Sequence, residues 1–159
     1  MTFIGIDPGA AGAVAFIYAN NPGGTVNEVE VIAVDAVAGM LGWASSSVAY
    51  AVIERGHAMP RQGGTSMFTF GKNCGRVIGW FEVLGIPFQE VSAVAWQKVM
   101  LAGEKRQSRP ERKASSIKVA QRLFPGVDLT LGVGKKPKDG ASDALLIAEF
   151  ARRTWKGGG

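Results

Sequence analysis

Short runs of hydrophobic residues, separated by turn-forming residues, occupy the first part of the chain and predict strands joined by tight turns. Three such runs cover residues 1–8, 12–18 and 26–34. Pro-Gly and Asn-Pro-Gly-Gly sequences separate them, and these residues favour turns. Because the connections are short, we expect these three strands to form an antiparallel meander.

The rest of the chain alternates between helical periodicity and short apolar runs. Apolar residues that recur every three or four positions predict helices, and the short runs predict two more strands. The expected helices cover residues 36–46, 70–84, 93–101, 111–124 and 139–155, and the expected strands cover 48–54 and 86–91. The segment 55–69 is rich in Gly, Pro, Arg and Gln and is expected to be an exposed loop. This order of elements predicts an α/β fold.

Composition indicates one globular domain. The chain has 159 residues, of which 47% are hydrophobic, so we expect a single domain over 1–156 and a frayed tail over 157–159. Its apolar runs are too short to span a bilayer, and the first strand leaves no room for a signal peptide. The single cysteine, Cys74, excludes an internal disulfide. We therefore expect a cytoplasmic protein with no membrane partner, and the net charge of +5 favours a polyanionic one.

Four acidic residues stand where predicted elements end or begin. Asp7 ends the first strand, Glu54 ends the fourth, and Asp139 and Asp143 share one face at the start of the last helix. Each has an ordinary alternative. Asp7 can cap its own turn, Glu54 can pair with Arg55, Asp139 can be an N-cap, and Asp143 can interact with the helix dipole.

Taken together, these acids indicate a metal-dependent catalytic site. The first and fourth strands can be parallel neighbours, which brings Asp7 and Glu54 side by side, and the last helix can pack across the same edge. Four carboxylates in one place repel each other unless cations are present. Two divalent cations form a clamp for phosphoryl transfer, and Mg²⁺ prefers oxygen ligands. We therefore predict that all four acids are catalytic and bind metal.

Basic and aromatic residues around these acids predict a surface for nucleic acid. The local excess of positive charge over 98–122 favours contacts with phosphates, although a solvated helix face is the ordinary alternative. The loop over 57–70 carries side chains that can read base edges or stack on bases, with core packing as the alternative for the phenylalanine. The candidate DNA-binding residues are Arg61, Gln62, Phe68, Lys98, Lys113, Lys118, Lys136 and Lys138.

The chain resembles the RuvC-type Holliday-junction resolvases of the RNase H-like superfamily. The resemblance rests on Ile4-Gly5-Ile6-Asp7-Pro8-Gly9, on Ala51-Val52-Ile53-Glu54, and on the segment 139–148 that contains Asp139 and Asp143. The segments 71–80, 96–98 and 123–125 are similar to the plant-organelle resolvases and their bacterial and phage relatives.

The resemblance implies a five-stranded mixed sheet flanked by helices and a homodimer. It further implies paired symmetric nicks in four-way DNA junctions, made with Mg²⁺ or Mn²⁺, two ions per site, and leaving 5′-phosphate and 3′-hydroxyl ends. A bacterial or phage-encoded protein is expected. The chain departs from RuvC in one respect, because its last two acids are four residues apart, whereas RuvC commonly spaces them by three.

Three other functions compete with this hypothesis. A ribonuclease H or a less selective nuclease would use the same acids on an RNA–DNA hybrid or other substrate. A non-catalytic DNA-binding homologue would keep the basic surface alone. The actin-like nucleotide-binding fold also opens with a strand, an Asp and a Gly-rich turn, but it needs a second half that this chain lacks, so no nucleotide cofactor is expected.

Overall fold

The computed structural model describes residues 1–21, 23–36, 48–56, 63–104 and 108–157. They form a five-stranded sheet with the order β3-β2-β1-β4-β5. Its strands are β1 (Thr2–Asp7), β2 (Ala13–Ala19), β3 (Val26–Ala33), β4 (Val48–Arg55) and β5 (Phe88–Ser92). The pairs β1–β2 and β2–β3 are antiparallel, and the pairs β1–β4 and β4–β5 are parallel. The predicted meander and the mixed five-stranded sheet are therefore confirmed.

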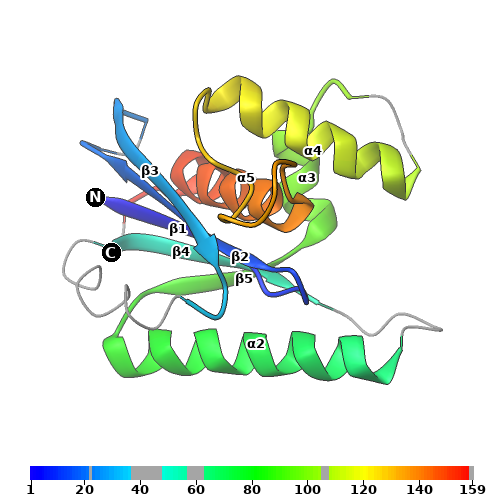
Figure 1. Ribbon diagram of the computed structural model, residues 1–159. Helices are drawn as coiled ribbons and strands as arrows, with labels where there is room; N and C mark the ends of the chain where they lie inside the picture. Colours follow the sequence, from blue (N-terminus) through cyan, green and yellow to red (C-terminus); the bar gives the residue numbers. More distant parts are fainter. Residues whose placement is uncertain (22, 37–47, 57–62, 105–107, 158–159) are drawn as a thin grey trace.

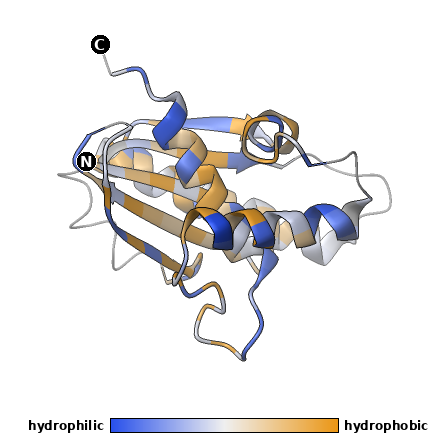
Figure 2. Ribbon diagram, turned by 90° about the horizontal axis from the view of Figure 1, so that it is seen from above, coloured by the Kyte–Doolittle hydropathy of each residue, from blue (hydrophilic) through white to orange (hydrophobic). Residues whose placement is uncertain are grey.

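Helices cover both faces of the sheet (Figure 1). One face carries α2 (Gly64–Leu84). The other carries α3 (Ala93–Met100), α4 (Arg109–Leu123) and α5 (Asp139–Thr154), with α5 directly on β1 and α4 packed against α5. Hydrophobic residues run along the strands and α5, whereas α4 carries many hydrophilic residues (Figure 2). No helix in the described part of the chain has the length and hydrophobicity that a bilayer span requires.

The alternation of side chains along each strand divides the core into two halves. Phe3 and Val52 face α5, while Ile4, Ile6 and Ile53 face α2. Both halves are buried, which explains why β1 and β2 read as continuous apolar runs rather than as alternating ones. The same alternation places the next residues, Asp7 on β1 and Glu54 on β4, on the side of α5.

A glycine lets α5 lie unusually close to β1. A Cβ atom on Gly5 would come within 2.1 Å of the Ala148 nitrogen and 2.2 Å of the Ala144 oxygen, both in the backbone of α5. Only a residue without a side chain permits this approach. The contact fixes α5, and with it the acids of its first turns, against the centre of the sheet.

Several predicted boundaries need correction. The helix expected from residue 70 begins at Gly64, so much of the predicted loop is helical, and Phe68 lies on the helix. The helix expected from residue 111 begins at Arg109, because Ser108 and Glu111 form a capping box in which the Ser108 nitrogen donates to Glu111 Oε2 at 2.7 Å. The last strand begins at Phe88 rather than at residue 86. Most of the helix predicted over 36–46 lies outside the described residues, as do Arg61 and Gln62.

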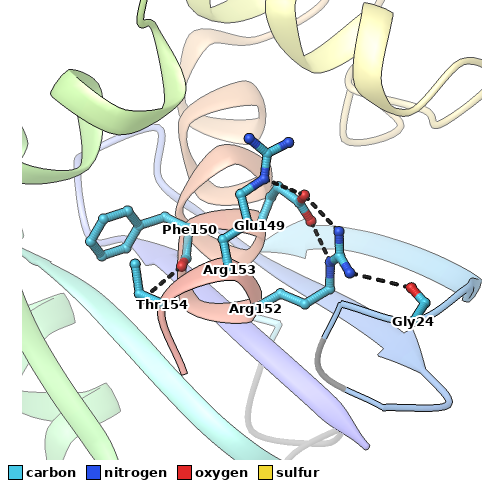
Figure 3. A network of polar contacts seen from close by, with 6 residues as sticks. All are labelled: Gly24, Glu149, Phe150, Arg152, Arg153 and Thr154. Carbon is cyan, nitrogen blue, oxygen red and sulfur yellow. Dashed lines mark hydrogen bonds and ion pairs between the residues drawn. The ribbon is translucent and has the colours of Figure 1, made fainter. Parts of the chain in front are cut away.

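The far end of α5 is held by a buried carboxylate (Figure 3). The Glu149 side chain is only 3% exposed and accepts hydrogen bonds from Arg152 Nε and Nη2 at 2.7 and 2.8 Å. Arg153 Nε donates to the same carboxylate at 2.7 Å. Arg152 also donates through Nη1 to the Gly24 carbonyl oxygen at 3.3 Å. This network ties the end of α5 to the turn between β2 and β3.

Acidification is expected to weaken this network. Burial alone would raise the pKa of Glu149, but the hydrogen bonds and charges of Arg152 and Arg153 outweigh it and lower the pKa below its ordinary 4.5. The stabilisation is therefore complete above pH 4.5 and is lost as the pH falls through the folded-state pKa. Breaking one side of a buried ion pair typically costs about 3–5 kcal/mol. Urea denaturation of wild type and Glu149→Gln should show a large difference in unfolding free energy at pH 7, which shrinks below pH 4. A difference that is independent of pH would contradict this assignment.

Candidate metal centre

The two strand-end acids lie next to each other on the sheet. Ile6 of β1 and Ile53 of β4 are partners in the parallel register, so Asp7 and Glu54 follow side by side at the carboxyl ends of neighbouring strands. Their side chains project to the face that α5 covers. The charge of Asp7 acts on the Glu54 carboxylate, which shows that the two groups are close.

The turn after β1 contributes one hydrogen bond to Asp7 and is itself held by others. The Gly9 nitrogen donates to Asp7 Oδ1 at 2.9 Å, and the Gly12 nitrogen donates to the Gly9 oxygen at 2.9 Å. The turn-capping role considered for Asp7 is thus present. A buried residue of α2, Asn73, donates through Nδ2 to the Pro8 and Gly9 carbonyl oxygens, both at 3.2 Å. Asn73 therefore anchors the turn from the opposite face of the sheet.

A tryptophan from α3 binds the second acid. Trp96 Nε1 donates to Glu54 Oε2 at 2.6 Å, and Trp96 is completely buried. The pKa of Glu54 is raised to about 6, because burial and the charge of Asp7 raise it more than the hydrogen bond from Trp96 lowers it. The pairing with Arg55 that was considered for Glu54 does not appear among the hydrogen bonds and ion pairs of the described residues.

The first turns of α5 bring the other two acids to the same rim. Asp139 is the first helical residue and Lys138 is the N-cap, so the N-cap role considered for Asp139 is wrong. Asp139 forms an ion pair with Lys113 of α4, and both side chains are well exposed, at 38% and 50%. Burial raises the pKa of Asp139, but the hydrogen bond and charge of Lys113 outweigh it and lower the pKa. Gly140 lets α5 start close to the turn after β1, since a Cβ there would lie 2.3 Å from the Ala11 backbone oxygen and 3.1 Å from Asp7 Oδ2.

Asp143 is a strongly perturbed carboxylate of the set. Its pKa is raised to about 7, chiefly by burial, against the lowering effect of a hydrogen bond from Ser116 of α4. The charges of Asp7, Glu54 and Asp139 raise it further, so all four acids interact electrostatically. Its Oδ1 atom is buried and accepts no hydrogen bond from any described residue. The site thus has an excess of negative charge and one unsatisfied buried acceptor.

Hard divalent cations match this set of donors. Carboxylate oxygens are the ligands that Mg²⁺ prefers, and a cation would remove the repulsion among the acids and satisfy Asp143 Oδ1. Across the described residues, however, no three His, Cys, Asp or Glu side chains are arranged to hold one ion as they stand. Three of the acids each accept a hydrogen bond from a different partner: Asp7 from Gly9, Glu54 from Trp96 and Asp139 from Lys113.

The described candidate DNA-binding residues lie on several elements around the rim. Phe68, on the first turns of α2, is 74% exposed, so core packing does not account for it. Lys98 on α3 and Lys113 and Lys118 on α4 are also exposed. Lys136 is exposed in the segment before α5, and Lys138 is half-buried at its N-cap. Their role in binding DNA stays a prediction.

Sequence reasoning missed Asn73 and Trp96, and also Ser116, which donates to Asp143. Asn73 is a polar residue on the buried side of an amphipathic helix, four positions before the buried Val77. A polar residue at such a position indicates a buried hydrogen bond and could have been found from the sequence. Trp96 begins the Trp-Gln-Lys motif that was noted only as a resemblance, and its partner Glu54 is 42 residues away in the sequence.

Comparisons with known proteins place the fold. No protein-family model matches the chain, and no curated protein matches it. Among solved structures, the RuvC structure of Thermus thermophilus matches with a TM-score of 0.57 and 18% identity, over 93% of this chain and 91% of that one. The T. thermophilus RuvC complex with a Holliday junction substrate matches with a TM-score of 0.57 and 17% identity, over 93% and 90%.

These likenesses define the fold class. The chain has an RNase H-like α/β fold, with a mixed five-stranded sheet between helices. Within that class its arrangement is of the RuvC type, since the match covers more than nine tenths of both chains.

Proposed function

We propose that this protein is a divalent-metal-dependent endodeoxyribonuclease that resolves four-way DNA junctions. One observation carries the proposal: four carboxylates from β1, β4 and α5 interact at one rim of a RuvC-type fold. The T. thermophilus RuvC that shares this fold has been solved with a Holliday junction substrate. A cluster of like charges is costly for a fold, so its presence favours a function that supplies cations.

The ligands of the proposed metal site are Asp7, Glu54, Asp139 and Asp143. When bound there, one or two Mg²⁺ or Mn²⁺ ions would activate water and stabilise the leaving oxygen of a phosphodiester. The chain positions these acids on rigid elements, namely two strand ends and a helix start, which is what a precise catalytic site requires. Hydrolysis of this type leaves 5′-phosphate and 3′-hydroxyl ends.

The substrate side of the proposal rests on charge and exposure. Lys113 of α4 pairs with Asp139, and Lys138 directly precedes it at the start of α5, so basic residues adjoin the acids and can contact phosphates near the scissile bond. Phe68 offers an exposed aromatic ring for stacking on an unpaired base. Two symmetric nicks in one junction suit a two-fold homodimer, which we propose as the active form.

A comparison of substrates tests the proposed function. Wild-type protein with Mg²⁺ should cut a synthetic four-way junction by paired nicks, and should cut linear duplex and RNA–DNA hybrid of the same sequence much more slowly. Chelation of the metal should abolish cutting. Preferential cutting of the hybrid would instead indicate a ribonuclease H, and binding of the junction without cutting in Mg²⁺ or Mn²⁺ would indicate a non-catalytic homologue.

A charge substitution on α4 tests the DNA surface. Lys118→Ala is expected to weaken junction binding and to reduce the slope of log affinity against log salt by about 1, because one phosphate contact is lost. The measurement is fluorescence anisotropy in EDTA at several salt concentrations, so cleavage does not interfere. Lys156→Ala is the matched control, because Lys156 is also exposed but lies after the far end of α5. If the slope of log affinity against log salt is the same for both variants and wild type, Lys118 does not contact DNA.

A further inference from the structure

The placement of Trp96 follows directly from the order of the elements. β5 pairs in parallel with β4, and its last residues, Val91 and Ser92, stand opposite Glu54 and Arg55. Ser92 then caps α3, with its Oγ accepting from the Ala95 nitrogen at 3.3 Å. Trp96 lies one turn into this helix, so its indole reaches back over the end of β4.

The contact that results joins a neutral donor to a charged acceptor. The Trp96 indole N–H donates to Glu54 Oε2 at 2.6 Å, and hydrogen bonds that an ionised group accepts are shorter and stronger than those between neutral groups. The indole N–H can only donate a hydrogen bond, so Trp96 cannot itself coordinate a cation. The indole binds Oε2, and within the described part of the chain no hydrogen bond to Glu54 Oε1 is present.

We propose that Trp96 is a positioning residue that orients Glu54 so that Oε1 is presented to a divalent cation. The inference rests on the proposed function in one respect, because it takes Glu54 as a metal ligand. A purely structural explanation is that a buried indole needs any acceptor. That explanation does not require the acceptor to be a carboxylate at the rim where Asp7, Asp139 and Asp143 also interact.

The substitution Trp96→Phe separates the two explanations. Phenylalanine keeps an aromatic ring in the core but removes the donor, so Glu54 loses its orientation. Loss of such a partner behind a metal ligand typically lowers metal affinity by about 10–100-fold. We expect a loss of that size for Mn²⁺ binding, measured by calorimetry on folded protein without DNA. The control Trp155→Phe removes an indole that packs edge-on against Phe3, with ring centroids 6.2 Å apart, and should leave Mn²⁺ affinity unchanged.

The indole N–H signal gives a second readout that does not depend on the variant folding well. In ¹⁵N-labelled wild-type protein, Mg²⁺ should shift the Trp96 Nε1–H resonance, because cation and indole share one carboxylate. The Trp155 resonance should not move. In Glu54→Gln the acceptor is a neutral amide, so the Trp96 resonance should start at a different position and respond much less to Mg²⁺.

The outcomes separate this inference from the proposed function. A shifted Trp96 signal in wild type, with weakened Mn²⁺ binding in Trp96→Phe, supports the inference. An unmoved signal, or unchanged Mn²⁺ affinity in Trp96→Phe while Asp7→Asn loses it, overturns the role of Trp96 and leaves the metal site intact. Absence of any Mn²⁺ or Mg²⁺ binding by wild-type protein overturns both.

Discussion

Replacing Asp7 by asparagine is expected to reduce cleavage of a four-way junction by at least about 10³-fold without destabilising the protein. Loss of a metal ligand removes several kcal/mol of transition-state stabilisation, and about 4 kcal/mol corresponds to a factor of 10³. Burial raises the pKa of Asp7, which the hydrogen bond from Gly9 partly offsets, and the charge of Asp139 raises it further. Ionised Asp7 is therefore unfavourable for folding near neutral pH. Asparagine removes that charge and can still accept the hydrogen bond from Gly9.

Cleavage and stability should be measured on the same preparation. Single-turnover cutting of the junction in Mg²⁺ gives the loss of activity, and thermal unfolding in EDTA gives the stability. Asp128→Asn is a matched control, because Asp128 Oδ1 accepts from the Thr130 nitrogen at 2.8 Å in the same way that Asp7 accepts from Gly9, but Asp128 is exposed and outside the site. Full activity of Asp7→Asn would contradict the catalytic assignment, and a markedly lower unfolding temperature would contradict the electrostatic argument.

Conflict between stability and function explains several features of this site. Glu54 and Asp143 also have pKa values raised by burial and by neighbouring carboxylates, to about 6 and about 7. A fold selected for stability alone would not place these groups together. The protein offsets part of the cost through the hydrogen bonds that Gly9, Trp96 and Ser116 donate to the individual acids.

The strands and the acids at their ends were predictable from sequence for a local reason. An acidic residue directly after an apolar run indicates the end of a buried strand. Asp7 and Glu54 could therefore be placed at strand ends. The i, i+4 spacing then set Asp139 and Asp143 on one face of a helix. These rules concern neighbours in the sequence, and the structure agrees with them.

The groups that orient the acids were not predictable in the same way. The contacts of Asn73 with Pro8, of Trp96 with Glu54 and of Lys113 with Asp139 join residues 65, 42 and 26 positions apart. They depend on how α2, α3 and α4 pack on the sheet, which no local pattern gives. The start of α2 was missed for a different reason, since Gly63 and Gly64 have poor helix propensity.

A second large effect is expected from Gly5→Ala. Its Cβ would lie within 2.1 Å of the Ala148 nitrogen and 2.2 Å of the Ala144 oxygen. Both atoms belong to helix backbone, so no rotation of a side chain relieves the clash, and α5 must move away from β1. Overpacking typically costs about 1–3 kcal/mol, and we expect a loss at or above the upper end of that range. Chemical denaturation gives the free energy of unfolding.

The consequence for the site is more specific than the loss of stability. α5 carries Asp139 and Asp143, while β1 carries Asp7, so a displaced α5 separates acids that interact in the native fold. Mn²⁺ affinity should therefore fall in Gly5→Ala even at temperatures where the variant is folded.

Gly71→Ala is the control. Gly71 lies on an exposed part of α2, and a Cβ there would meet no described atom within 4 Å. Alanine should therefore stabilise that helix by about 0.5–1 kcal/mol. Wild-type stability in Gly5→Ala would show that α5 does not lie against the backbone of β1. Unreduced or increased stability in Gly71→Ala, together with reduced stability in Gly5→Ala, would assign the loss to the contact between Gly5 and α5.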